Sequence, residues 1–246
     1  MAKVFIGTSG WVYSHWEEIF YPQDLSPRDK LKYFSQHFKT TEINYSFYHL
    51  PRTTTYQNWY NQTPGDFIFA VKTSRFITHI RRLKNVKAAW KTFIENALNL
   101  KEKLGPILFQ FPSSFQATQE NVKRLEEFLK LICKNKELKF AFEFRHKNWC
   151  QEKIYKLLKK YNTAWVVADS SRYSKMEIVT AGFVYIRMHG SKVMFSSKYS
   201  NKELKELARK IKKWQKTGDV FCYFNNDAYG HAVENAKELL ELCSGK

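Results

Sequence analysis

FAFEFRHKNW, residues 140–149, begins as an alternating β-strand. Its three phenylalanines share one side of the strand, whereas Glu143 and Arg145 share the other. An aromatic side is ordinary for a strand that helices cover. A buried carboxylate or guanidinium is costly unless it is paired or has a function. We therefore expect Glu143 and Arg145 to point into a polar site where this strand ends.

The rest of the chain repeats the pattern of a short apolar strand followed by an amphipathic helix. Strands are predicted at residues 3–7, 40–45, 66–72, 107–111, 140–145, 164–169, 183–189 and 220–225. Helices are predicted between them, beginning with one that Ser26 and Pro27 open. No linker or change of composition interrupts the alternation, so residues 1–246 are predicted to form one α/β domain, a single (β/α)8 TIM barrel. A doubly wound open sheet is the alternative fold.

Composition limits the class of protein and of partner. With 43% hydrophobic residues and 20 Phe, 14 Tyr and 7 Trp among 246 residues, one large core is expected and disorder is excluded. The formal charge of +18 favours anionic partners such as nucleic acid or phosphorylated metabolites. A lysine-rich, solvated surface that binds nothing in particular explains the charge equally well.

The cysteines and the first residues bear on the compartment. Cys133, Cys150, Cys222 and Cys243 are far apart and form no C-x-x-C pair, so a zinc ribbon is excluded and a disulfide framework is not expected. The first residues contain no apolar run long enough for a signal peptide or a membrane span. A cytoplasmic protein with no membrane partner is expected. No particular oligomeric state is predicted.

Polar side chains gather where the predicted strands end, which is where barrels place their catalytic groups. These residues are Glu42, Asn44, Lys72, Gln110, Glu143, Arg145, Asp169, Arg187, His189, Asn225 and Asp227. The two-residue spacing within several pairs directs both members toward the barrel axis. Any single pair is more often a structural ion pair, but a barrel interior has little use for so many polar groups. We therefore predict one shared site at this end of the barrel.

Blocks of sequence that follow one another along nearly the whole chain resemble a known family. They are GTSGW (7–11), TEIN (41–44), FAVK (69–72), LGP (104–106), QFP (110–112), FEFR (142–145), RMHG (187–190) and FNND (224–227). This pattern resembles the YecE-like family, catalogued as domain of unknown function 72. The resemblance implies a TIM barrel but no activity, because the family is uncharacterised. Trp11 and Tyr48, in and beside these blocks, join the candidate substrate-binding residues.

The first functional hypothesis is a hydrolase or lyase that acts on an anionic, phosphate-bearing substrate. Arg145, Arg187 and Lys72 would bind the oxyanion, since guanidinium groups suit bidentate contacts to phosphate. Glu143 or Asp169 would act as general base and His189 as general acid, with Glu42 a further catalytic candidate. Asn44, Gln110, Asn225 and Asp227 would orient the substrate.

The second hypothesis is a divalent-metal-dependent isomerase or an endonuclease-like barrel. Glu42, Glu143, Asp169 and His189 offer the oxygen and nitrogen ligands that divalent metals use. Neighbouring cations would compete with a metal, and the chain has no H-E-x-x-H motif. A divalent metal is therefore an alternative and no other cofactor is predicted.

The third hypothesis is a non-catalytic protein that binds nucleic acid. Trp11, Tyr13 and Trp16 would stack on bases, and the basic stretches at residues 75–91 and 202–216 would contact phosphates. Glutamates within the second stretch, Glu203 and Glu206, are also typical of an ordinary solvated helix face. A solvated helix face without a nucleic-acid partner is therefore the favoured interpretation of both basic stretches.

Overall fold

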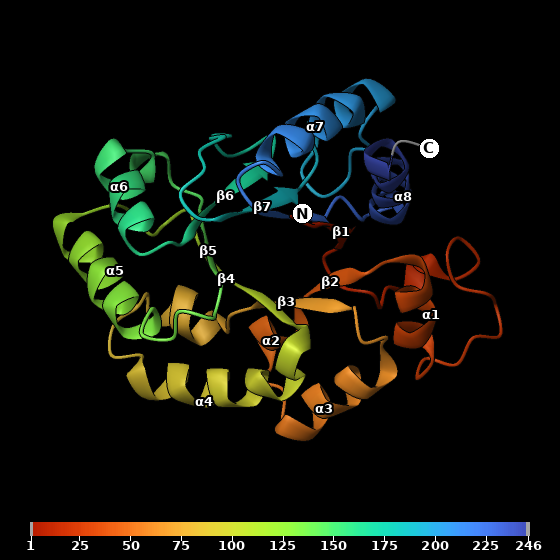
Figure 1. The fold of residues 1–246 in the computed structure, drawn as a ribbon, viewed down its shortest axis with the longest axis horizontal. Helices are drawn as coiled ribbons and strands as arrows, with labels where there is room; N and C mark the ends of the chain where they lie inside the picture. The colour runs from red at the N-terminus through yellow and green to blue at the C-terminus, as the bar shows by residue number, and fades with distance from the viewer. Residues whose placement is uncertain (1, 245–246) are drawn as a thin grey trace.

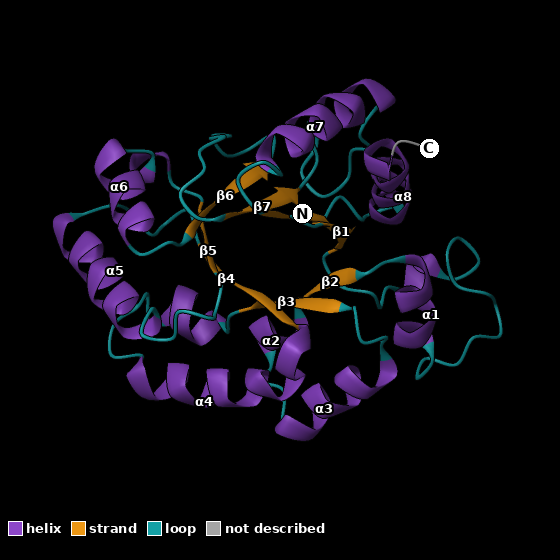
Figure 2. Ribbon diagram, viewed as in Figure 1, coloured by secondary structure: helices purple, strands orange, loops and turns teal. Residues whose placement is uncertain are grey.

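The structure, a computed structural model, describes residues 2–244, which form a ring of eight strands with helices around the outside (Figures 1 and 2). The strands are β1 (Val4–Thr8), β2 (Thr40–Ile43), β3 (Ile68–Lys72), β4 (Leu104–Phe111), β5 (Phe140–Phe144), β6 (Ala164–Asp169), β7 (Phe183–Met188) and β8 (Asp219–Phe224). Their order is β1-β8-β7-β6-β5-β4-β3-β2, and every adjacent pair is parallel. This confirms the (β/α)8 barrel, and the open-sheet alternative is wrong.

The ring closes where β1 meets β2. A single parallel bridge joins Ser9 to Glu42, and the Gly10 amide donates to the Glu42 carbonyl at 2.8 Å. The strands approach each other so closely that a Cβ at Gly7 would lie 2.1 Å from the Thr40 carbonyl oxygen. Only glycine fits at this position without moving the backbone. The seam therefore depends on Gly7.

Helices follow the strands and cover the ring. They are α1 (Lys30–His37), α2 (Tyr45–Tyr48), α3 (Thr53–Gln62), α4 (Lys87–Ala97), α5 (Gln119–Ile132), α6 (Glu152–Lys160), α7 (Asn201–Trp214) and α8 (His231–Ser244). Short 3₁₀ segments are η1 (Ser14–Trp16), η3 (Leu98–Lys103) and η4 (Lys147–Trp149), and η2 (Phe76–Ile80) is a π-helix. Within residues 2–244, no helix combines the length and apolar character that crossing a bilayer requires.

Three local predictions differ from the structure. The helix expected from residue 26 begins at Lys30, after a turn. The strand expected at residues 40–45 ends at Ile43, because α2 begins at Tyr45. The π-helix η2 after β3 was not predicted. Both unpredicted elements lie directly beyond strand ends, where they position side chains at the mouth of the barrel.

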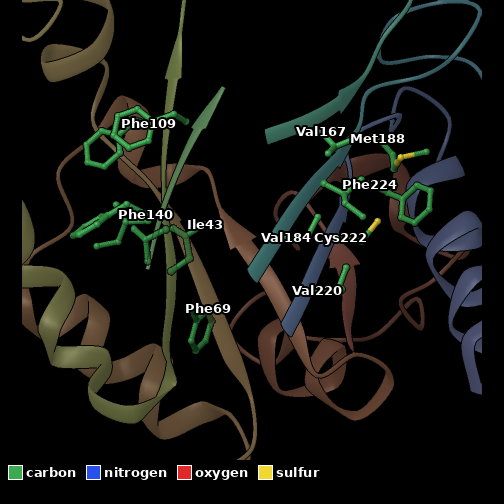
Figure 3. Close-up of a cluster of buried hydrophobic side chains, with 14 of the residues drawn as sticks. Ile43, Phe69, Phe109, Phe140, Val167, Val184, Met188, Val220, Cys222 and Phe224 are labelled. Atoms are coloured by element: carbon green, nitrogen blue, oxygen red, sulfur yellow. The ribbon is translucent and has the colours of Figure 1, made fainter. Parts of the chain in front are cut away.

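Alternate residues of each strand enter two separate hydrophobic layers. One set packs between strands and helices, including Phe69, Phe109, Phe140 and Val167 (Figure 3). The other set fills the barrel interior with smaller side chains, two phenylalanines and two tyrosines, among them Ala70, Leu108, Ala141, Val166, Ala168, Phe183, Tyr185, Phe221 and Tyr223. This alternation decides which polar groups at the strand ends face the barrel axis.

Candidate active site

A cavity of about 1200 Å³ opens at the carboxyl ends of the strands. Eight of the predicted site residues line it: Trp11, Asn44, Tyr48, Lys72, Gln110, Arg145, Arg187 and Asn225. Side chains that were not predicted as site residues line it too, among them Arg28, Tyr45, Phe47, Arg75, His79 and Phe195. Five lining residues are Arg or Lys, whereas none of the described lining residues is Asp or Glu. The cavity wall is therefore cationic and rich in aromatic rings.

Arg187 is the centre of a buried ion-pair network beneath the cavity. Its Nε and Nη2 donate to the two carboxylate oxygens of Glu42, at 2.9 and 2.7 Å, which is a bidentate pair. Glu42 also accepts hydrogen bonds from the hydroxyls of Ser9, at 2.6 Å, and Tyr185, at 2.7 Å. The four hydrogen bonds that Glu42 accepts therefore all come from side chains of the barrel itself. Glu42 is wholly buried and does not line the cavity.

Glu143 connects the same arginine to the cavity wall. One Glu143 oxygen accepts from Arg187 Nη1 at 2.6 Å, and the other accepts from Arg145 Nε at 3.0 Å. His189 Nε2 lies 3.5 Å from Glu143, and its Nδ1 lies 3.2 Å from the Asn225 amide nitrogen. If the Asn225 amide donates to Nδ1, the His189 proton is on Nε2, facing Glu143. Glu143 and His189 therefore lie behind the wall, in contact with residues that form it.

Burial and pairing shift the pKa values of Glu42, Glu143 and His189 in opposite directions. Burial alone would raise the pKa of both carboxyls, but the charge of Arg187 and its hydrogen bonds hold the pKa of Glu42 below, and that of Glu143 well below, the usual value. Burial lowers the pKa of His189 and outweighs the attraction of Glu143. The network therefore contains two carboxylates, a guanidinium and a neutral imidazole at neutral pH.

Lys72 differs from the other buried charges because its amine has no partner. It lies at the end of β3 with 9% of its surface exposed, and it lines the cavity. Among the described residues, its Nζ makes no hydrogen bond or ion pair, and it lies 4.1 Å from the centre of the Phe47 ring. Burial, followed by the positive charge of Arg187, lowers the pKa of Lys72 to about 7.

His79 and Gln110 form the wall next to Lys72. Gln110 Nε2 donates to the Phe111 carbonyl at 3.1 Å and lies 3.4 Å from His79 Nε2. Burial and then the charge of Lys72 lower the pKa of His79 to about 4, so this imidazole is neutral at pH 7. At the end of the neighbouring strand β2, the side-chain oxygen of Asn44 is buried and has no hydrogen-bond partner among the described residues. Asn44 therefore presents an unused acceptor.

Two predicted site residues lie elsewhere. Asp169 occupies the side of β6 that faces the helices, and it accepts hydrogen bonds from the Tyr199 hydroxyl at 2.8 Å and from Lys175 at 2.5 Å. Asp227 accepts from the Trp16 indole nitrogen at 2.9 Å and pairs with His15 at 2.9 Å. Neither carboxylate lines the cavity. The expectation that all strand-end residues face one site is wrong for these two.

The aromatic residues proposed for stacking are also placed differently. Trp16 is wholly buried, and Trp11 is buried against Trp59 while still lining the cavity. The Tyr13 hydroxyl donates to the Ser9 carbonyl. The exposed rings at the rim are Tyr45 and Tyr48 instead, with 53% and 64% of their surfaces accessible.

The proposed metal ligands do not form a metal-binding group. Glu42 and Glu143 are both paired with Arg187, and Asp169 faces the opposite side of its strand. Across residues 2–244, no three His, Cys, Asp or Glu side chains are arranged to hold a metal ion. The residues present therefore do not fit the metal-dependent hypothesis.

Comparison with known proteins gives the family. A family model described as a protein of unknown function, DUF72, matches residues 5–246. The chain belongs to the DUF72 family. The UPF0759 protein YunF of Bacillus subtilis (strain 168) is 27% identical, over 97% of this chain and 94% of its own length.

Solved structures of DUF72 proteins share the fold. A family member from Thermotoga maritima MSB8 superposes with a TM-score of 0.88 at 28% identity, covering 98% of this chain and 99% of its own. A second, from Enterococcus faecalis V583, gives 0.85 at 21% identity, covering 98% and 95%. The family predicted from the sequence blocks is therefore confirmed.

Several residues of the DUF72 site were not predicted as site residues. Ser9 lies in the block GTSGW, Tyr185 shares a strand side with Arg187, and Arg75 begins the basic stretch at residues 75–91, so a signal existed for these three. Phe47 belongs to α2 and His79 to the π-helix η2, neither of which was predicted. The predicted strands and helices therefore did not indicate that Phe47 and His79 reach the cavity.

Proposed function

We propose that the protein is a hydrolase or lyase that binds an anionic, phosphate-bearing substrate at the mouth of the barrel. One observation carries the proposal. Five cationic residues, Arg28, Lys72, Arg75, Arg145 and Arg187, line the cavity, and none of the described lining residues is acidic. Cations gathered in a low-dielectric cleft attract and orient phosphate oxygens.

Arg145 is the guanidinium best placed to contact the substrate. Its Nε donates to Glu143, and its guanidinium lies over the Tyr173 ring, 4.9 Å from the ring centre, but within residues 2–244 its two terminal nitrogens make no hydrogen bond. Its side chain is 16% exposed, whereas that of Arg187 is 1% exposed and holds two carboxylates. Arg145 is therefore the proposed phosphate contact, and Arg187 adds positive charge to the wall while the two carboxylates hold its guanidinium.

The buried carboxylates and the histidine act through these cations. Glu42, Glu143 and His189 do not face the cavity, so we assign them the role of positioning residues that fix Arg187 and Arg145. Lys72, with a pKa of about 7, is the group able to exchange a proton with a substrate near neutral pH. Asn44, Gln110 and Asn225 supply hydrogen-bonding groups at the wall.

The test is binding of inorganic phosphate by calorimetry to wild type and to Arg145→Gln. Loss of one charge-assisted hydrogen bond of about 1.5–3 kcal/mol weakens binding by roughly tenfold or more. Arg209→Gln removes the same charge from an exposed position on α7, outside the cavity, and leaves affinity unchanged. Equal affinities for all three proteins, or no phosphate binding by wild type, contradict the proposal.

A second candidate function, binding of single-stranded nucleic acid, is supported by the exposed rim tyrosines Tyr45 and Tyr48 beside Arg28 and Arg75. Bases stack on such rings while the arginines contact phosphates. Replacement of both tyrosines by alanine is expected to weaken binding of a mixed oligonucleotide, and wild-type affinity is expected to fall steeply with salt. Affinity that is independent of salt rejects this candidate.

We further propose that residues 1–246 act as one domain in the cytoplasm. The four cysteines are free thiols in the structure, which supports a reducing compartment.

A further inference from the structure

We infer that Lys72 is a nucleophile that forms an imine with a phosphorylated aldehyde or ketone bound in the cavity. The inference rests on the proposed phosphate site and adds the reacting group and the substrate class. It begins from the position of one amine. Lys72 ends β3 on the side that faces the barrel axis, and its backbone carbonyl accepts from the Ser46 hydroxyl at 2.5 Å.

The Lys72 amine is directed at the cavity rather than at the protein. Its Nζ makes no hydrogen bond or ion pair with any residue from 2 to 244, and its neighbour is the face of the Phe47 ring, 4.1 Å away. A ring face attracts an ammonium ion but offers no lone pair to accept its protons. With no acceptor among residues 2–244, this amine is open to a ligand in the cavity that Lys72 lines.

Two other buried lysines show what a structural role requires. Lys103 donates to the carbonyls of Tyr60 and Thr63, at 2.6 and 2.7 Å, and is 3% exposed. Lys30 is paired with Glu17. Neither of these two lysines lines the cavity. Lys72 has the burial of a structural lysine but lacks the partners.

Burial keeps part of the Lys72 population uncharged at neutral pH. It is the largest cause that lowers the pKa of Lys72 to about 7, and the charge of Arg187 is the next. Arg145 also repels the ammonium form, Glu42 and Glu143 attract it, and His79 beside it is neutral. A neutral amine is the form that attacks carbonyl carbon.

The reaction balances without an oxidant or reductant. The Lys72 nitrogen forms a bond to the carbonyl carbon, and the resulting carbinolamine loses its hydroxyl group. The carbonyl oxygen leaves as water with the two hydrogens that the amine carried. The product is an imine, whose protonated form withdraws electrons from the neighbouring carbon. Bond cleavage next to the original carbonyl, the chemistry of a lyase, becomes easier in this adduct.

The wall around Lys72 favours a phosphorylated carbonyl compound. Arg145 lines the same cavity as the amine, and so does Asn44, whose buried side-chain oxygen has no hydrogen-bond partner among the described residues. A phosphate bound by Arg145 would hold a carbonyl group within reach of Lys72, and a small rotation of the Asn44 side chain would let its oxygen accept from a substrate hydroxyl. Both requirements are met by sugar phosphates in their open-chain form.

The test is reductive trapping. The full-length protein is incubated at neutral pH with dihydroxyacetone phosphate and cyanoborohydride, which reduces an imine to a stable secondary amine. Intact mass and peptide mapping then locate the label. We expect one adduct per chain on Lys72, while Lys103 and Lys30 in the same digest remain unlabelled. Unphosphorylated dihydroxyacetone is expected to label Lys72 several-fold more slowly, and added inorganic phosphate to slow labelling by the phosphorylated compound.

The outcomes separate this inference from the proposed function. If wild type binds phosphate but Lys72 stays unlabelled, the imine is rejected and the phosphate site stands. If both probes label Lys72 equally and phosphate does not compete, the phosphorylated substrate class is rejected. Lys72→Arg keeps the positive charge but lacks the nucleophilic amine, so it is expected to show only background labelling at this position. If this variant fails to fold, the wild-type comparison of the two probes still decides the question.

Discussion

Arg187 and Glu42, 145 positions apart in the sequence, form a bidentate ion pair inside the barrel, with Nε–Oε2 and Nη2–Oε1 distances of 2.9 and 2.7 Å. The pair joins β7 to β2 across the axis of the ring, and Glu143 adds a third charge. The arginine that looked like a substrate contact in the sequence is thus satisfied by the protein itself. Its removal would leave Glu42 buried without a counterion and Glu143 paired with Arg145 alone.

Arg187→Met is therefore expected to destabilise the protein by about 3–5 kcal/mol, the usual result of breaking a buried pair. Urea unfolding followed by circular dichroism measures the change. Arg124→Met, which breaks the pair with Glu120 on α5, is the control and should cost less than about 1 kcal/mol. Equal effects of the two substitutions would contradict the structural role of Arg187.

Lys72→Met is expected to change how stability depends on pH. The pKa of Lys72 is about 7 in the folded protein, compared with the usual value of 10.5. Between these values the unfolded chain binds more protons, so wild-type stability rises with pH relative to the variant. Below pH 7 the lysine is protonated in both states, and the difference is constant. Denaturation midpoints of both proteins across this window measure the trend.

The control for this pH series is Lys202→Met, at an exposed position at the start of α7. Comparing each variant with wild type cancels the contributions of all other ionisable groups. If the difference in stability between Lys72→Met and wild type does not vary from pH 7 to 10.5, the amine is solvated in the folded protein as in the unfolded chain, which contradicts the prediction.

Gly7→Ala is expected to destabilise the seam between β1 and β2 by about 1–3 kcal/mol, the range found for overpacked sites. The added methyl carbon would lie 2.1 Å from the Thr40 carbonyl oxygen. This oxygen belongs to the backbone of β2, which cannot easily move away. Gly65→Ala is the matched control, because a Cβ there meets nothing within 4 Å. Thermal unfolding of the two variants should differ clearly; similar midpoints would argue against close approach of the strands.

Asp169→Asn is expected to leave phosphate affinity unchanged within about twofold, which corresponds to less than about 0.5 kcal/mol. The reason is that this carboxylate contacts Tyr199 and Lys175 on the helix side of β6 and is not part of the cavity wall. Calorimetric titration with phosphate checks the prediction. A large loss of affinity without loss of stability would return Asp169 to the site.

Much of the architecture could be predicted because strand and helix periodicities are local. The alternation in residues 140–145 correctly placed Glu143 and Arg145 on the side opposite the phenylalanines. The same reasoning could not be applied to residues 164–169, where both sides of the strand are apolar. Parallel strands buried on two faces carry no polar side to mark the axis. For this reason Asp169 was assigned to the wrong face.

The sequence by itself determined the eight strands, most of the helices around them, the family and the end of the barrel at which polar groups collect. Only the tertiary structure decided which of those groups pair with one another and which stay available to a substrate. Arg187 is paired, whereas Lys72 and the terminal nitrogens of Arg145 are not, and nothing near these residues in the chain distinguishes them. The physical reason is that pairing and burial depend on strands brought together by closure of the ring, and these interactions act through space rather than along the chain.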